Sequence, residues 1–201
     1  MNENSYPWID EVDREIFGCN TSDENLSLIR YRNMLDTHFG SMISPEMVWS
    51  KDWGVGVISC GDSEFEDELL EQLFGKVFRG IGDAMPIRNF TKNGFQKNSE
   101  LEEFSPPLIG TIEFSYENFL RIRRGMIPLY SQNYFLISKD RSLCYLGVSN
   151  GYHLFAGERD VVENALEIGV REMWKNALSD HFPHDYMRVD LLRAARMYGY
   201  V

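Results

Sequence analysis

Cysteines, long apolar runs and a basic N-terminal patch are scarce or missing in this chain of 201 residues. The three cysteines, Cys19, Cys60 and Cys144, are an odd and scattered set without C-x-x-C spacing, which argues against a disulfide framework or a structural zinc site. No stretch approaches the roughly 20 apolar residues that span a bilayer, and no basic patch precedes an apolar core at the N-terminus. We therefore expect a cytoplasmic protein that does not bind membranes.

Nucleotide-binding fingerprints and internal repeats are also missing. Neither the P-loop pattern nor G-x-G-x-x-G occurs, and the two glycines at Gly54 and Gly56 are too short a pattern to count as either. The sequence has no low-complexity segment and no fixed repeat. On these grounds we expect no cofactor.

Acidic residues are what the chain has in excess. The formal net charge is −11, and the first 103 residues carry 20 acidic against 9 basic side chains, whereas the remainder carries 11 of each. A negative field opposes direct binding of nucleic acid or an anionic membrane and favours a basic partner. Acidic surfaces also keep proteins soluble, so the charge alone is compatible with a surface that binds nothing.

The clearest local pattern covers residues 134–156. It alternates between apolar runs that are typical of strands and polar segments that are typical of turns. The apolar runs are residues 134–137, 143–148 and 152–156. A three-stranded antiparallel segment is predicted here.

The second turn of this segment contains Asn150 and Gly151, which tolerate the positive φ of a two-residue type I′ turn. Such a turn pairs Val148 with His153 and places Cys144 on the same sheet face as His153. Four residues along the strand then separate the thiol from the imidazole by roughly 14 Å, which excludes a catalytic pair. We predict that Cys144 is a buried small hydrophobe.

Periodicity places helices and further strands around this segment. Two short strands are predicted over residues 54–58 and 108–114. Periodicity and capping signals predict helices over residues 7–18, 21–40, 63–79, 115–124, 159–179 and 190–198. One more helical turn is predicted to start at residues 44–46. We therefore expect a single α+β domain over residues 1–201, with a mainly antiparallel sheet flanked by helices. An N-terminal helical pair occupies residues 1–40, and the sheet-containing core occupies residues 54–201.

The predicted helix over residues 63–79 has an acidic face. At about 100° per residue, its four candidate carboxylates fall within an arc of roughly 100° opposite the apolar stripe. They are Glu64, Asp67, Glu68 and Glu71. Acids in a first turn are also stabilised by the helix dipole, by roughly 0.3–1 kcal/mol each. We take the four as partner-binding candidates, together with Trp49 and Trp53, because large aromatic rings are frequent interface anchors.

Two patterns point to hydrolytic chemistry, and neither has the context that it needs. Residues 147–151 match G-x-S-x-G with Ser149 as the serine, but that motif requires a helix after the turn, and the aromatic run that follows predicts a strand. His181 and His184 flank Pro183, which predicts a loop rather than the helical face of a metal-binding H-E-x-x-H motif. We assign no catalytic residue and no metal ligand.

These observations favour a non-enzymatic cytosolic binding protein. We expect an inhibitor or immunity-type protein that neutralises a basic protein partner, such as a nuclease toxin. The alternative is a small hydrolase that uses Ser149 or a metal held by His181 and His184. The residues after Gly151 discriminate between the two, because a strand there favours binding and a helix favours the hydrolase.

Overall fold

The computed structural model describes residues 42–60, 63–87, 90–91, 94–95, 110–126, 133–148, 151–182 and 185–201. The helical pair predicted within residues 1–40 lies outside this part of the chain, as do Ser149 and His184. No helix in the described part is long and apolar enough to cross a bilayer.

A six-stranded sheet forms the centre of the fold, in the order β1-β8-β7-β6-β2-β5. Every neighbouring pair of its strands is antiparallel, which confirms the expected sheet type. The strands are β1 Trp53–Ser59, β2 Ile81–Ile87, β5 Gly110–Glu113, β6 Asn133–Ser138, β7 Leu143–Val148 and β8 Tyr152–Glu158. A separate two-stranded ladder joins β3 Phe90–Thr91 and β4 Gly94–Phe95.

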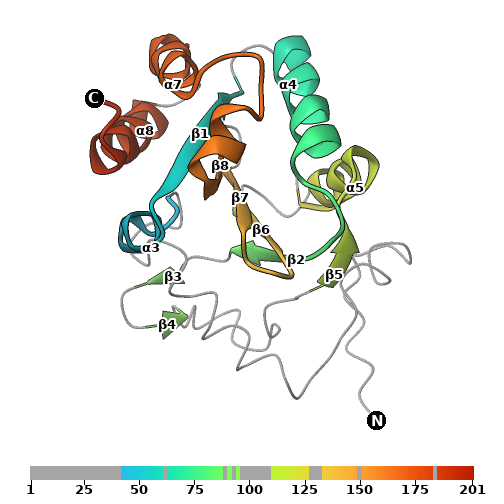
Figure 1. The fold of residues 1–201 in the computed structure, drawn as a ribbon. Helices are drawn as coiled ribbons and strands as arrows, with labels where there is room; N and C mark the ends of the chain where they lie inside the picture. Colours follow the sequence, from blue (N-terminus) through green and yellow to red (C-terminus); the bar gives the residue numbers. More distant parts are fainter. Residues whose placement is uncertain are drawn as a thin grey trace.

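Helices pack around this sheet and complete the α+β class. They are α3 Pro45–Ser50, α4 Ser63–Lys76, α5 Tyr116–Met126, α6 Arg159–Glu163, α7 Val170–Ser179 and α8 Asp185–Tyr198. Figure 1 shows α4 and α5 together on one side of the sheet, whereas α7 and α8 lie beside the edge strand β1. Serine side chains cap two of these helices: the Ser44 hydroxyl accepts a hydrogen bond from the Met47 N–H, and the Ser115 hydroxyl accepts one from the Asn118 N–H.

The prediction of one helix over residues 159–179 is wrong. The chain forms two helices there, α6 and α7, and Gly169 precedes α7 with an extended backbone of φ −64° and ψ 148°. Ala165 and Leu166 in the connection are nevertheless buried. The apolar spacing therefore continues through a segment that is not helical, which is why periodicity alone joined the two helices.

The predicted register of the β7–β8 hairpin is also wrong. Val148 pairs with Tyr152 and Gly147 with His153, so three residues rather than two connect the strands. Gly151 has no positive φ; its N–H instead donates to the Val148 carbonyl across 3.1 Å. Because side chains alternate along a strand, a shift of one residue moves each side chain of β8 to the other face. His153 consequently shares a face with Tyr145 of β7 and not with Cys144, which is fully buried as predicted.

The edge strand β1 is closed by aromatic side chains from the C-terminal part of the chain. Trp174 of α7 donates its indole N–H to the Val55 carbonyl at 2.8 Å, and the Val55 N–H donates to the Tyr200 hydroxyl at 3.2 Å. The Trp174 and Tyr200 rings stack with their centroids 5.2 Å apart. Exposed strand edges are sites of unwanted pairing, so this cover protects the sheet.

Candidate functional site

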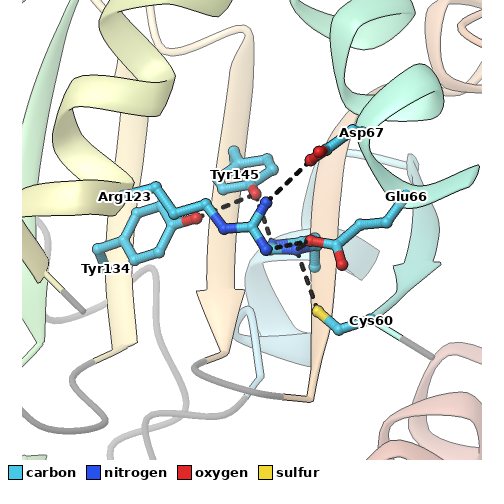
Figure 2. Close-up of polar contacts among 7 residues, drawn as sticks. Cys60, Glu66, Asp67, Arg123, Tyr134 and Tyr145 are labelled. Atoms are coloured by element: carbon cyan, nitrogen blue, oxygen red, sulfur yellow. Dashed lines mark hydrogen bonds and ion pairs between the residues drawn. The ribbon is translucent and has the colours of Figure 1, made fainter. Parts of the chain in front are cut away.

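A buried polar cluster lies where α4 and α5 cover the sheet. Seven residues from six parts of the fold meet there, and we call them the His153 cluster (Figure 2). They are Cys60 after β1, Glu66 and Asp67 of α4, Arg123 of α5, Tyr134 of β6, Tyr145 of β7 and His153 of β8. Polar groups are uncommon inside a core unless they are paired, so the contacts of this cluster decide what it can do.

His153 is the centre of the cluster and is 3% exposed. Its Nε2 lies 2.9 Å from Glu66 Oε1 and 3.2 Å from Cys60 Sγ. Its Nδ1 lies 2.6 Å from the Tyr145 hydroxyl, which in turn lies 3.4 Å from the hydroxyl of Tyr134. A neutral ring with its proton on Nε2 fits these contacts, because it donates to Glu66 and accepts from Tyr145.

Arg123 compensates the charge of Glu66, whose side chain is 3% exposed. Its guanidinium lies 2.7 Å from Glu66 Oε1 and 3.3 Å from Asp67 Oδ1. The Arg123 and Asp67 side chains are 25% and 55% exposed, so the chain of contacts runs from the core to the surface. A buried carboxylate is tolerable only with partners of this kind.

The surroundings set the protonation states of the three central groups. Burial lowers the pKa of His153, although Glu66 opposes the shift, so the imidazole is neutral. Burial raises the pKa of Glu66, but the hydrogen bond from His153 and the positive charge of Arg123 outweigh it, and the net pKa is lowered. Burial, followed by the Glu66 charge, raises the pKa of the Cys60 thiol, which stays protonated.

The geometry does not support a catalytic thiol. A relay of nucleophile, imidazole and carboxylate needs the nucleophile on one ring nitrogen and the carboxylate on the other. Here both Cys60 and Glu66 face Nε2, and a tyrosine hydroxyl occupies Nδ1. The raised thiol pKa also works against attack, because the thiolate is the nucleophile.

Aromatic packing holds the cluster in place. The Tyr145 and His153 rings stack with centroids 5.6 Å apart, and the Phe119 ring packs edge-on against Tyr145 at 5.5 Å. Gly147 lies under the Tyr134 ring, where a Cβ atom would overlap the ring carbons. The absence of a side chain at this position therefore allows Tyr134 to lie across the sheet and reach Tyr145.

Three of the four acidic residues proposed from the sequence are exposed on α4, namely Asp67, Glu68 and Glu71. Glu68 and Glu71 are exposed, Asp67 shares Arg123 with Glu66, and the Glu64 side chain is outside the described part of the structure. Four acids therefore do not act as one equivalent group. Asp67 belongs to the ion-pair network, and Glu68 and Glu71 carry the exposed charge.

The two tryptophans occupy different environments. Trp49 of α3 is 57% exposed, whereas Trp53 is 8% exposed and has the Lys51 ammonium 4.4 Å from its ring centroid. Since α3 precedes β1 and α4 follows it, the two helices lie at opposite ends of that strand (Figure 1). Trp49 and the acidic face of α4 consequently do not form one surface.

The serine-hydrolase candidate lacks the structural context that it needs. Residues 152–158 form β8, so the chain after Gly151 continues as a strand, as predicted, and not as the helix of a nucleophile elbow. His181 is exposed, and Ser149 and His184 are outside the described residues. Gly151 itself begins no helix, and the hairpin interpretation of residues 147–151 is confirmed.

A cavity of about 280 Å³ lies between the end of β1, α4 and α7. Its lining includes Leu69, Met173 and Ala177, and at its polar side Ser59 donates a hydrogen bond to Asp180. The one carboxylate in this lining, Asp180, is already hydrogen-bonded to Ser59, so the cavity presents fewer reactive or metal-ligating groups than the His153 cluster.

Sequence reasoning missed the central residues of the cluster. One local signal was available: Glu66 comes three and four residues before Leu69 and Leu70, which places a carboxylate on the apolar stripe of α4. An acid at such a position is rarely buried unless it is paired. Apart from Asp67, the other members come from other segments and share no spacing that would connect them with Glu66.

The comparisons with known proteins found no relative. No family model, curated protein or solved structure matches this chain.

Proposed function

We propose that the protein is a non-enzymatic binding protein of inhibitor or immunity type, which neutralises a basic protein partner through the outer face of α4. The observation that carries the proposal is the placement of Glu68 and Glu71. They are exposed one turn apart, while Leu70 and Leu73 of the same helix are fully buried. Their charges therefore point away from the core and can meet a partner without disturbing it.

The helix that carries these carboxylates is firmly anchored. Phe74 stacks on Phe119 of α5 with ring centroids 4.4 Å apart, and it also packs edge-on against Tyr145 of the sheet. A surface that is already ordered before association loses little conformational entropy when it binds. Together with the net charge of −11, a fixed pair of carboxylates favours fast, electrostatically steered encounter with a basic surface.

A charge-reversal variant tests the proposal. Glu68→Lys combined with Glu71→Lys should remove a basic partner from the proteins that the tagged chain retains from an extract of its native host, measured by quantitative mass spectrometry. The matched control is Glu158→Lys with Glu163→Lys, which changes the net charge equally at two exposed positions outside α4. The control should retain the partner.

The identified partner then permits a kinetic measurement. The wild-type association rate should fall steeply between about 30 and 300 mM salt, because the Debye length shortens over this range. The α4 variant should associate more slowly at low salt and lose most of the salt dependence. Equal rates for wild type and both variants would assign the α4 carboxylates to solubility and would refute the proposal.

A further inference from the structure

Three metal-ligating atoms converge in the His153 cluster. Cys60 Sγ, the Glu66 carboxylate and His153 Nε2 all lie within 4.8 Å of one another. They come from the end of β1, from α4 and from β8, so the folded core brings together what the sequence keeps far apart. Thiolate, imidazole and carboxylate are the three side-chain donors that zinc accepts.

Two protons hold these groups together when no ion is bound. The Nε2 proton of His153 goes to Glu66 across 2.9 Å, and the Cys60 thiol can donate to the same carboxylate. Cys60 Sγ also lies 3.2 Å from Nε2. An ion between the three atoms would replace both protons and accept a lone pair from each ligand.

The distances are close to those of a tetrahedral ion. With zinc bonds of about 2.3 Å to sulfur and about 2.0 Å to nitrogen and oxygen, tetrahedral ligand atoms lie roughly 3.3–3.6 Å apart. The Glu66–His153 and Cys60–His153 separations of 2.9 and 3.2 Å need to open by only a few tenths of an ångström. Rotation of the partly exposed Cys60 side chain supplies part of this movement.

Tyr145 supplies the outer contact that a ligating histidine needs. A metal-bound imidazole nearly always donates its other N–H to a fixed acceptor, which orients the ring. The Tyr145 hydroxyl lies 2.6 Å from Nδ1 and can accept as well as donate, so the ring can place its proton on Nδ1 and present a lone pair at Nε2.

The charges around the site also balance. On binding, a divalent ion displaces the Cys60 thiol proton, which leaves to solvent, and the ion, the resulting thiolate and the Glu66 carboxylate sum to zero. Arg123 and Asp67 neutralise one another at 3.3 Å. Arg123 can keep its hydrogen bond to Glu66, because ligating carboxylates are themselves hydrogen-bonded. Its positive charge opposes the ion, however, and so limits the affinity.

We propose that Cys60, Glu66 and His153 form a site for one divalent transition-metal ion of the zinc type, with Tyr145 as a positioning residue. The fourth coordination position lies on the side of Cys60, the most exposed of the three ligands, and takes water. The ion ties the end of β1 to α4 and β8, and the proposal is independent of partner binding at Glu68 and Glu71.

Titration of the metal-free full-length chain with zinc and cobalt tests the site. We expect one ion per chain by calorimetry, a rise in the thermal midpoint with zinc concentration, and the cobalt–thiolate charge-transfer band together with the visible bands of tetrahedral cobalt. Absence of tight binding, or a cobalt spectrum without a thiolate band, would overturn the proposal.

Variants locate the ion. Cys60→Ser should abolish the thiolate band and weaken zinc binding more than the roughly 10–100-fold expected for loss of an outer contact. Tyr145→Phe should weaken it by roughly 10–100-fold and keep the thiolate band. Because Cys60 is partly exposed, its serine variant should keep the far-ultraviolet circular dichroism of the wild type.

Two matched controls test whether the ion binds at other cysteines or histidines instead. Cys19→Ser with Cys144→Ala tests the other thiols, and His181→Ala with His184→Ala tests the two histidines that the sequence places near each other. Both double variants should bind zinc like the wild type and keep the cobalt–thiolate band. Loss of binding or of the band in either control, with Cys60→Ser unaffected, would assign the ion elsewhere and refute the site.

Discussion

Helix α4 carries two glutamates, two residues apart, in opposite environments. Glu66 is 3% exposed and contacts His153 and Arg123, whereas Glu68 is exposed to solvent. Two residues along a helix correspond to a rotation of roughly 200°, which separates the buried side from the outer side. The same functional group therefore serves the core at one position and the surface at the other.

On α4, the partners of a carboxylate decide its role, and the residue type does not. Glu66 has lost its hydration and depends on Arg123 and His153 to remain ionised inside the fold. Glu68 keeps its water, contributes little to stability, and acts on other molecules through its long-range field. Substitutions of Glu66 should therefore change the free energy of unfolding, and substitutions of Glu68 should change the rate of association with a partner.

The largest effect is expected from Glu66→Ala. The substitution leaves the Arg123 guanidinium and the His153 imidazole without their shared acceptor, and breaking a buried pair in this way costs about 3–5 kcal/mol. Glu68→Ala should stay within about 0.5 kcal/mol of the wild type. The urea midpoints of the wild type, Glu66→Ala and Glu68→Ala measure this difference in stability. Equal midpoints for both variants would contradict the difference between the two sides of α4.

Two glycines, one buried beside the His153 cluster and one on the exposed side of α4, test whether packing differs in the same way. Gly147→Ala places a methyl group against the Tyr134 ring and should destabilise the fold by about 1–3 kcal/mol. A methyl group at Gly75 of α4 would meet no neighbouring atom within 4 Å, so Gly75→Ala should stabilise the helix by about 0.5–1 kcal/mol. Thermal and urea unfolding should show effects of opposite sign. A stabilising Gly147→Ala would show that Tyr134 does not need the space.

A smaller loss is expected when only a hydroxyl is removed from the buried side. Tyr145→Phe keeps the ring and leaves His153 Nδ1 without its partner at 2.6 Å, which should cost about 1–3 kcal/mol. Tyr134→Phe removes a contact of 3.4 Å and should cost less. Urea unfolding of both variants measures the difference. An equal or larger loss for Tyr134→Phe would place the important hydroxyl elsewhere.

The sequence predicts much of the fold because several elements have local causes. The apolar run of residues 143–148 becomes β7, and the stripe that contains Leu69, Leu70 and Leu73 becomes the buried side of α4. Both depend on patterns within a few residues. The prediction of a single helix over residues 159–179 is wrong because buried residues continue through the non-helical connection between α6 and α7.

The site could not be predicted in the same way, because it depends on register. Asn150 and Gly151 favour a two-residue turn, and the three-residue connection that forms instead moves His153 to the face of Tyr145. Cys60 then reaches His153 only through the pairing of β1 with β8, and Arg123 reaches Glu66 only through the packing of α5 against α4. Glu66 alone carried a local signal, as an acid on an apolar stripe.

Asp140 is exposed like Glu68 but hydrogen-bonded like Glu66. It therefore shows whether exposure or hydrogen bonding decides how much a carboxylate contributes to stability. Its Oδ1 accepts from the Ser138 hydroxyl at 2.6 Å and from the Ser142 N–H at 3.0 Å. The Ser138 hydroxyl, followed by the Ser142 contacts, lowers the pKa of Asp140 from its ordinary value. A carboxylate with a lowered folded-state pKa stabilises the fold above its unfolded pKa, and this contribution is lost as the pH falls through the folded value.

Asp140→Asn should therefore destabilise the turn by no more than about 1 kcal/mol at pH near 7, since exposed charge interactions are weak. The difference from the wild type should shrink as the pH falls below about 4, where the wild-type carboxylate takes up its proton. Urea midpoints of both proteins across this range measure it, with Glu68→Gln as the exposed control that should show no comparable trend. A penalty that persists unchanged into acid would mean that the shape of the side chain, and not its charge, holds the turn. A trend of equal size in Glu68→Gln would mean that exposure alone governs both carboxylates.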